Sequence, residues 1–149
     1  FLSARLGNCA MNDIKLTLAE EVKKLLQHLQ IGLFNHILIS GNNEKLDDLY
    51  ELLWQECQSQ KMNASQFIIT NESIHSIPDQ EYSGLMLIKG LECLKPKQNE
   101  TYALRSRLDV GQYQGLKSFI FCEEKAVNKH FNDYEAPFYK FCLRHSLHA

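Results

Sequence analysis

The sequence predicts an α/β fold built on a mostly parallel sheet of four to five strands flanked by helices. Short, continuously apolar runs, typical of strands buried on both faces of a parallel sheet, recur along the chain. Segments whose apolar residues repeat at helical spacing lie between these runs. The apolar runs are residues 37–41, 67–70, 85–88 and 118–122.

Helices are predicted before, between and after these strands. Thr17 and Glu20 fit a capping box, which begins a helix that we expect to end near Gln30. A second helix is expected to follow a cap at Asn43, with an apolar stripe at Leu46, Leu49, Tyr50, Leu53, Trp54 and Cys57. Further helical segments are predicted at residues 100–108, 125–131 and 137–147. Strands alternating with helices in this way favour a Rossmann-like or P-loop-like three-layer sandwich.

Length and composition indicate one globular domain. The chain has 149 residues, of which 44% are hydrophobic and 23% charged, as in ordinary folded proteins. We expect residues 1–16 to be a tail or linker and residues 17–149 to form a single α/β domain. Because the chain begins at Phe1, the sequence leaves open whether residues 1–10 are native and whether the chain is a fragment of a larger protein.

Charge is nearly balanced overall but unevenly distributed. The formal net charge is −2, which argues against broad binding to nucleic acid or to an anionic membrane, with nucleic acid kept as an open alternative. Residues 1–88 carry a net −5 and residues 89–149 a net +3. An anionic ligand is therefore expected to prefer the second half of the chain.

The cysteines indicate a reducing compartment. Their number, five, is odd, and they are widely spaced, unlike the framework of a small secreted disulfide protein. The chain has neither a run of 18 apolar residues nor the pattern of a secretion signal near its start. These features predict a cytoplasmic protein that does not contact a membrane.

Polar residues that follow the predicted strands form the first candidate site. Ligands of parallel sheets bind beyond the carboxyl ends of the strands. The candidate lining residues at that edge are Ser40, Asn42, Thr70, Lys89 and Glu123. Arg105 and Arg107 are added as anion contacts, although arginines two positions apart on a helix do not face each other. They could clamp one phosphate only from a loop or a strand.

Residues 39–45 stand where a phosphate-binding loop would lie, but the loop is incomplete. No second glycine follows Gly41, and Leu46, Asp47 and Asp48 stand where a P-loop has Ser or Thr after its lysine. Residues 119–124 end in Glu123 and Glu124, which resembles the acidic strand end of nucleotide hydrolases. The two segments together resemble a P-loop-like domain that does not hydrolyse nucleotides.

No other motif predicts catalysis. No serine lies in a nucleophile elbow, and the acidic neighbours of Cys122 are expected to raise its pKa. Cys142, His145 and His148 occur at three-residue steps, but a zinc site needs a fourth ligand, so no metal is predicted and the question stays open.

The sequence therefore favours a non-catalytic regulatory or protein-interaction domain, a degenerate nucleotide-fold module, with no cofactor. The chain is expected to bind a protein partner. The alternative is a small-molecule or nucleotide-binding domain that uses the strand ends and Arg105 and Arg107, with a phosphate-containing ligand. Enzymatic activity is left undecided, with no catalytic residue proposed.

Overall fold

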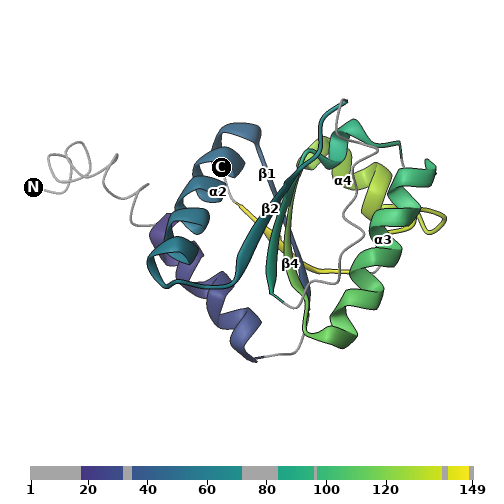
Figure 1. The fold of residues 1–149 in the computed structure, drawn as a ribbon. Helices are drawn as coiled ribbons and strands as arrows, with labels where there is room; N and C mark the ends of the chain where they lie inside the picture. Colours follow the sequence, from purple (N-terminus) through teal and green to yellow (C-terminus); the bar gives the residue numbers. More distant parts are fainter. Residues whose placement is uncertain (1–17, 32–34, 72–83, 96, 139–140, 148–149) are drawn as a thin grey trace, which may run out of the picture.

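A computed structural model describes residues 18–31, 35–71, 84–95, 97–138 and 141–147. Five strands form one parallel sheet in the order β2-β3-β4-β1-β5 (Figure 1). The strands are β1 (His36–Gly41), β2 (Ala64–Ile68), β3 (Leu85–Lys89), β4 (Lys117–Glu123) and β5 (Leu143–Ser146). The predicted α/β class and its parallel sheet are thus confirmed.

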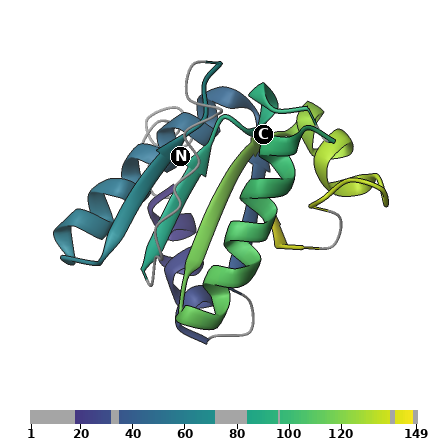
Figure 2. The ribbon, with the colours of Figure 1, turned by 45° about the vertical axis from the view of Figure 1, so that its right-hand side comes forward.

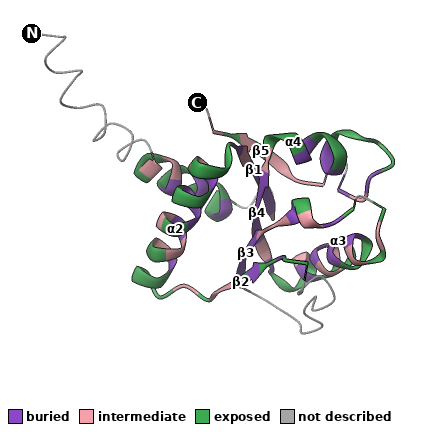
Figure 3. Ribbon diagram, turned by 90° about the horizontal axis from the view of Figure 1, so that it is seen from above, coloured by how far each residue is buried: buried purple, intermediate pink, exposed green. Residues whose placement is uncertain are grey.

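Helices cover both faces of the sheet, which makes three layers (Figure 3). A helix at residues 18–31 and α2 (Asn43–Ser59) lie on one face. The other face carries α3 (Asn99–Gly111), which runs alongside β4 (Figure 2), and α4 (Glu124–Val127), which continues into the π-helical turn η3 (Asn128–Asn132). Two short 3-10 turns, η1 (Leu91–Cys93) and η2 (Gln112–Gln114), follow β3 and α3.

The continuously apolar strands are explained by a core on each side of the sheet. Along β4, Phe119 and Phe121 pack against α2 and the helix at 18–31, whereas Ile120 points to the opposite core under α3 and α4. Because successive side chains of a strand point to opposite faces, a central strand covered on both sides must be apolar at every position.

The predicted strand at 67–70 is shifted in the structure. The strand β2 begins at Ala64 and ends at Ile68, and it lies at the edge of the sheet. Phe67 is buried, but Ile68 has an exposed fraction of 44%. The prediction of a strand buried on both faces is therefore wrong for this run, because one side of an edge strand has less cover than a central strand has.

The predicted helix at 137–147 is also wrong. Residues Leu143–Ser146 form β5, which pairs in parallel with β1 in the register Ile37↔Leu143. Leu143 and Leu147 pack against the core on the α2 side, and Cys142 packs against the other core. This alternation follows the two-residue period of a strand. The strand β5 thereby pairs with the edge of β1 that β4 does not occupy.

The second helix begins one residue earlier than predicted. Asn42, not Asn43, is the N-cap of α2, since its side-chain oxygen accepts a hydrogen bond from the backbone N–H of Lys45 at 2.9 Å. Asn43 is the first helical residue. The predicted apolar stripe is buried except for Trp54, which is partly buried against the same core. The capping role of Thr17 lies outside the described residues.

Candidate functional site

The strand order creates a crevice between the carboxyl ends of β1 and β4. These strands are neighbours, and Gly41 is in register with Glu123. The chain leaves β1 into α2 on one face and leaves β4 into α4 on the other face. Two neighbouring strands whose connections diverge in this way mark the point at which open α/β sheets bind ligands.

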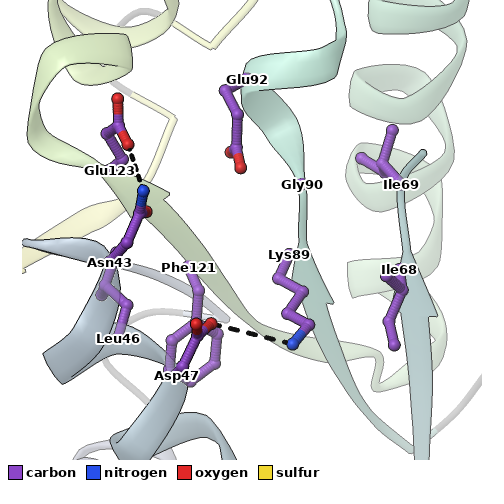
Figure 4. Close-up of a pocket in the computed structure, with 10 residues that line it drawn as sticks. All are labelled: Asn43, Leu46, Asp47, Ile68, Ile69, Lys89, Gly90, Glu92, Phe121 and Glu123. Carbon is purple, nitrogen blue, oxygen red and sulfur yellow. Dashed lines mark hydrogen bonds and ion pairs between the residues drawn. The ribbon is translucent and has the colours of Figure 1, made fainter. Parts of the chain in front are cut away.

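A cavity of about 190 Å³ lies at this edge (Figure 4). Its lining comes from the start of α2, from the ends of β2, β3 and β4, and from η1. Gly90 forms the turn between β3 and η1 with a φ of 91°, and a Cβ there would lie 2.1 Å from the carbonyl oxygen of Ile69. Only glycine fits this turn, because both the left-handed backbone and the close approach exclude a side chain.

Carboxylates dominate the charge of the cavity. Among the described residues, Asp47, Glu92 and Glu123 line it together with one cation, Lys89. The Lys89 ammonium lies 3.9 Å from an Asp47 carboxylate oxygen and 4.6 Å from the centre of the Tyr50 ring. Asp47 therefore partly balances the positive charge of Lys89. A phosphate entering the cavity would meet a lining with a net negative charge.

The position of a phosphate-binding loop is occupied by side-chain contacts. Asn42 uses its amide oxygen to cap α2. Asn43 donates a hydrogen bond from Nδ2 to the Glu123 carboxylate at 2.6 Å, which links the start of α2 to the end of β4 across the crevice (Figure 4). The helix start that would bind a phosphate thus carries an amide oxygen and faces a carboxylate.

Only two of the residues predicted as lining, Lys89 and Glu123, line this cavity. Ser40 lies in β1 but its hydroxyl is 3.3 Å from that of Ser146, on the β5 side of the strand. Thr70 is exposed two residues beyond β2 and does not line the cavity. Asn42, as the helix cap, borders the crevice without lining it.

Arg105 and Arg107 do not join the strand-end residues. Both lie on α3, so the loop or strand geometry that a shared phosphate clamp requires is not present. The guanidinium of Arg105 stacks on Phe141, 3.8 Å from the ring centre, and Nη1 donates to the Pro137 carbonyl at 3.2 Å. Arg105 therefore holds the segment around Pro137 and Phe141 against α3.

The cysteines in the part of the chain that the structure describes show no sign of nucleophilic activation. Burial raises the pKa of Cys57 to about 11 and those of Cys122 and Cys142 to about 12. For Cys122 the direction agrees with the sequence-based expectation, but the main cause is burial, with Glu92 and Glu123 adding to it. Thiols with such raised pKa values are protonated at neutral pH and are poor nucleophiles.

Cys142 and His145 do not have the helical arrangement considered for a zinc site. Cys142 and His145 belong to the extended segment that contains β5, and His145 forms an ion pair with Glu21 of the helix at 18–31. His148 lies outside the described residues. Within the part of the chain that the structure describes, no group of three or more His, Cys, Asp or Glu side chains could hold a metal ion.

Two surface features were not predicted from the sequence. One is the outer side of α3, whose exposed residues are mostly uncharged, and the other is a cluster of three lysines beyond η1 and α4. The uncharged stripe at residues 102, 106, 110 and 113 follows helical spacing and could have been found in the sequence. The lysine cluster depends on how η1 and α4 pack, which local patterns do not reveal.

Comparison of the chain with protein-family models, with curated proteins and with solved structures found no match. Among the described residues, no helix has both the length and the apolar character needed to cross a bilayer.

Proposed function

We propose that the chain is a non-catalytic regulatory or protein-interaction domain that keeps the architecture of a nucleotide-binding fold but acts through protein contacts. The observation that carries the proposal is the exposed outer face of α3, which is uncharged and partly aromatic. The acidic strand-end cavity supports the non-catalytic part. The cytoplasmic location expected from the cysteines stays a prediction.

Among the described residues, the groups of the crevice that could neutralise a phosphate are already paired with carboxylates. Phosphoryl transfer depends on backbone N–H groups, a lysine and a metal ion to neutralise the phosphates. Here Lys89 is paired with Asp47, and Asn43 with Glu123, at the place where the phosphates would lie. The cavity of about 190 Å³ is also smaller than the range of about 300–1,000 Å³ that is usual for small-molecule sites.

The outer face of α3 has the composition of a protein-contact surface. Tyr102, Ser106 and Val110 lie four residues apart, and Tyr113 follows in η2, so they continue one exposed face. The exposed fractions are 46% for Tyr102, 54% for Val110 and 85% for Tyr113. Aromatic side chains are enriched and charged ones depleted at the centres of protein interfaces. An exposed helix face of this kind therefore favours binding to another protein.

The proposal is tested by affinity capture with a surface variant. The double variant Tyr102→Ser/Tyr113→Ser removes both rings from the α3 face without touching the core, because both side chains are exposed. The wild-type chain captures proteins from a lysate of its source cells, and mass spectrometry identifies them. The amount of each specifically captured protein is expected to fall at least tenfold with the double variant. A tenfold loss corresponds to about 1.4 kcal/mol, within the usual range for removal of interface tyrosines.

Tyr134→Ser is the matched control. Tyr134 is 75% exposed and lies after η3, outside the stripe formed by residues 102, 106, 110 and 113. Capture by this variant is expected to equal that of the wild type. Equal retention of the same proteins by all three chains would contradict a contact through the α3 face.

A further inference from the structure

A second cavity, of about 380 Å³, lies beside the strand-end crevice. Glu92 and Glu123 line both cavities and so form the boundary between them. Figure 4 shows these two side chains extending from η1 and from the end of β4. The second cavity is formed by the segment that follows β3 and by α4 with η3. Its volume falls within the usual range for small-molecule sites.

Three lysines give this cavity a positive side. Lys95 comes from the segment after η1, and Lys125 and Lys129 lie four residues apart on successive turns of α4 and η3. All three are exposed, and none forms an ion pair with a carboxylate in the part of the chain that the structure describes. The Lys95 backbone is fixed by hydrogen bonds at both ends, since its N–H donates to Gln98 and its carbonyl accepts from Thr101.

A buried histidine in the same lining has an unused ring nitrogen. His130 is only 1% exposed, and its Nε2 lies 3.0 Å from the carbonyl oxygen of Leu94. Because a carbonyl oxygen can only accept, Nε2 donates and Nδ1 carries a lone pair. That Nδ1 is buried and makes no hydrogen bond with any described residue. Buried polar atoms of native proteins nearly always have a partner, so this nitrogen is an unsatisfied polar atom behind the lining of the cavity.

We propose that this cavity binds a small hydroxylated molecule that carries a phosphate group, of the sugar phosphate class. A phosphate monoester has a charge of about −1.5 to −2 at neutral pH, which suits three lysine ammonium groups. The carboxylates of Glu92 and Glu123 accept hydrogen bonds from ligand hydroxyls, which they could not do from the phosphate itself. The inference goes beyond the proposed protein contact and rests on different residues.

The residues of this site explain why a phosphate prefers this cavity to the neighbouring one. The strand-end cavity has three carboxylates and one lysine, which is already paired with Asp47. The second cavity has three lysines and two carboxylates. The ligand therefore binds with its phosphate toward Lys125 and Lys129 and its hydroxyls toward the shared boundary.

Thermal unfolding and NMR titration test the proposal with glucose 6-phosphate, ribose 5-phosphate and glycerol 3-phosphate as probes. At least one of the three is expected to stabilise the chain and to shift the ring nitrogen resonances of His130. Glucose and ribose, which lack the phosphate, are expected to do neither at the same concentration. Stabilisation by a ligand specific to the folded state grows with its concentration over Kd, so millimolar affinities are measurable.

The variant Lys125→Ala/Lys129→Ala is expected to raise the Kd of the bound probe at least tenfold. The matched control is Lys23→Ala/Lys24→Ala, which removes two exposed lysines from the helix at 18–31 on the opposite face of the sheet. The control is expected to change the Kd less than twofold. Equal losses of affinity in the two variants would indicate diffuse charge attraction and would overturn the proposal. It is also overturned if none of the three probes binds at 10 mM.

Discussion

At the scale of single residues, His36 shows how a buried polar side chain can join three elements. Its Nε2 donates to the carbonyl of Leu108 in α3 at 3.1 Å, and its Nδ1 accepts from the Ser118 hydroxyl in β4 at 2.7 Å. The ring also stacks on Phe141, with 4.7 Å between ring centres. The neutral ring is thus fully paired, and burial lowers the pKa of His36 to about 4.

The low pKa of His36 predicts a loss of stability in acid. Above pH 6.5 the ring is neutral in the folded and unfolded states, so its stabilising effect is fully present. As the pH falls toward 4, the unfolded chain takes up a proton that the folded chain refuses, and the free energy of unfolding falls by about 3 kcal/mol from this group. Urea unfolding between pH 7 and pH 4 measures this loss.

The variant His36→Gln separates this effect from that of other groups. It is expected to be less stable than the wild type at pH 7, because Gln cannot reproduce both hydrogen bonds and the stacking. Its stability should then fall less steeply toward pH 4. His28→Gln, at an exposed position, is the control. A pH dependence that is the same in His36→Gln and in the wild type would contradict this account of His36.

Arg105 gives a second prediction at this scale. Arg105→Ala removes the stacking on Phe141 and the hydrogen bond to Pro137, so the free energy of unfolding should fall by about 1–2 kcal/mol. Arg105→Lys should recover less than half of the loss, because an ammonium cannot stack as a planar guanidinium does. If Arg105→Lys recovered the full stability of the wild type in thermal unfolding, the positive charge alone would account for the stabilising effect of Arg105. The residue expected to bind an anion has a structural role in the described structure.

At the scale of elements, the start of α2 is set by Asn42. Asn42→Ala removes the oxygen that accepts from the Lys45 N–H, and it is expected to lower the free energy of unfolding by about 1 kcal/mol. Asn42→Ser should keep most of the stability, since Ser caps helices equally well. Asn43→Ala loses only an exposed contact with Glu123 and should cost less. If chemical denaturation showed a larger loss of unfolding free energy for Asn43→Ala than for Asn42→Ala, the assignment of Asn42 as the cap would be contradicted.

Elements with one strong pattern could be predicted from the sequence, whereas β5 could not. The central strands β1, β3 and β4 and the stripe of α2 are covered by packing partners, so their apolar patterns are unambiguous. In β5, Leu143 and Leu147 face one core while Cys142 faces the other, and the same apolar residues also fit a helical period. Pairing with the open edge of β1 favours the strand over the helix at these residues. That edge exists only in the assembled sheet.

At the scale of the whole molecule, strand order determines which predicted residues meet. The carboxyl ends of all strands lie at one edge, as the sequence predicted, but only the order β2-β3-β4-β1-β5 places the start of α2 beside Glu123. Ser40 faces β5, and Arg105 lies on α3 with its guanidinium held by Phe141 and Pro137. Side-chain direction and neighbouring strands are long-range properties, so local spacing does not determine them.

The central claim is that the strand-end edge of this three-layer α/β fold does not hydrolyse nucleotides. The most direct test is phosphate release from ATP and GTP with Mg²⁺, measured for the wild-type chain and for Glu123→Gln. Both are expected to release phosphate no faster than buffer alone, because Lys89 and Asn43 are committed to carboxylates. Turnover of about 1 per second or more, the low end of usual enzyme rates, that Glu123→Gln abolishes would contradict the claim.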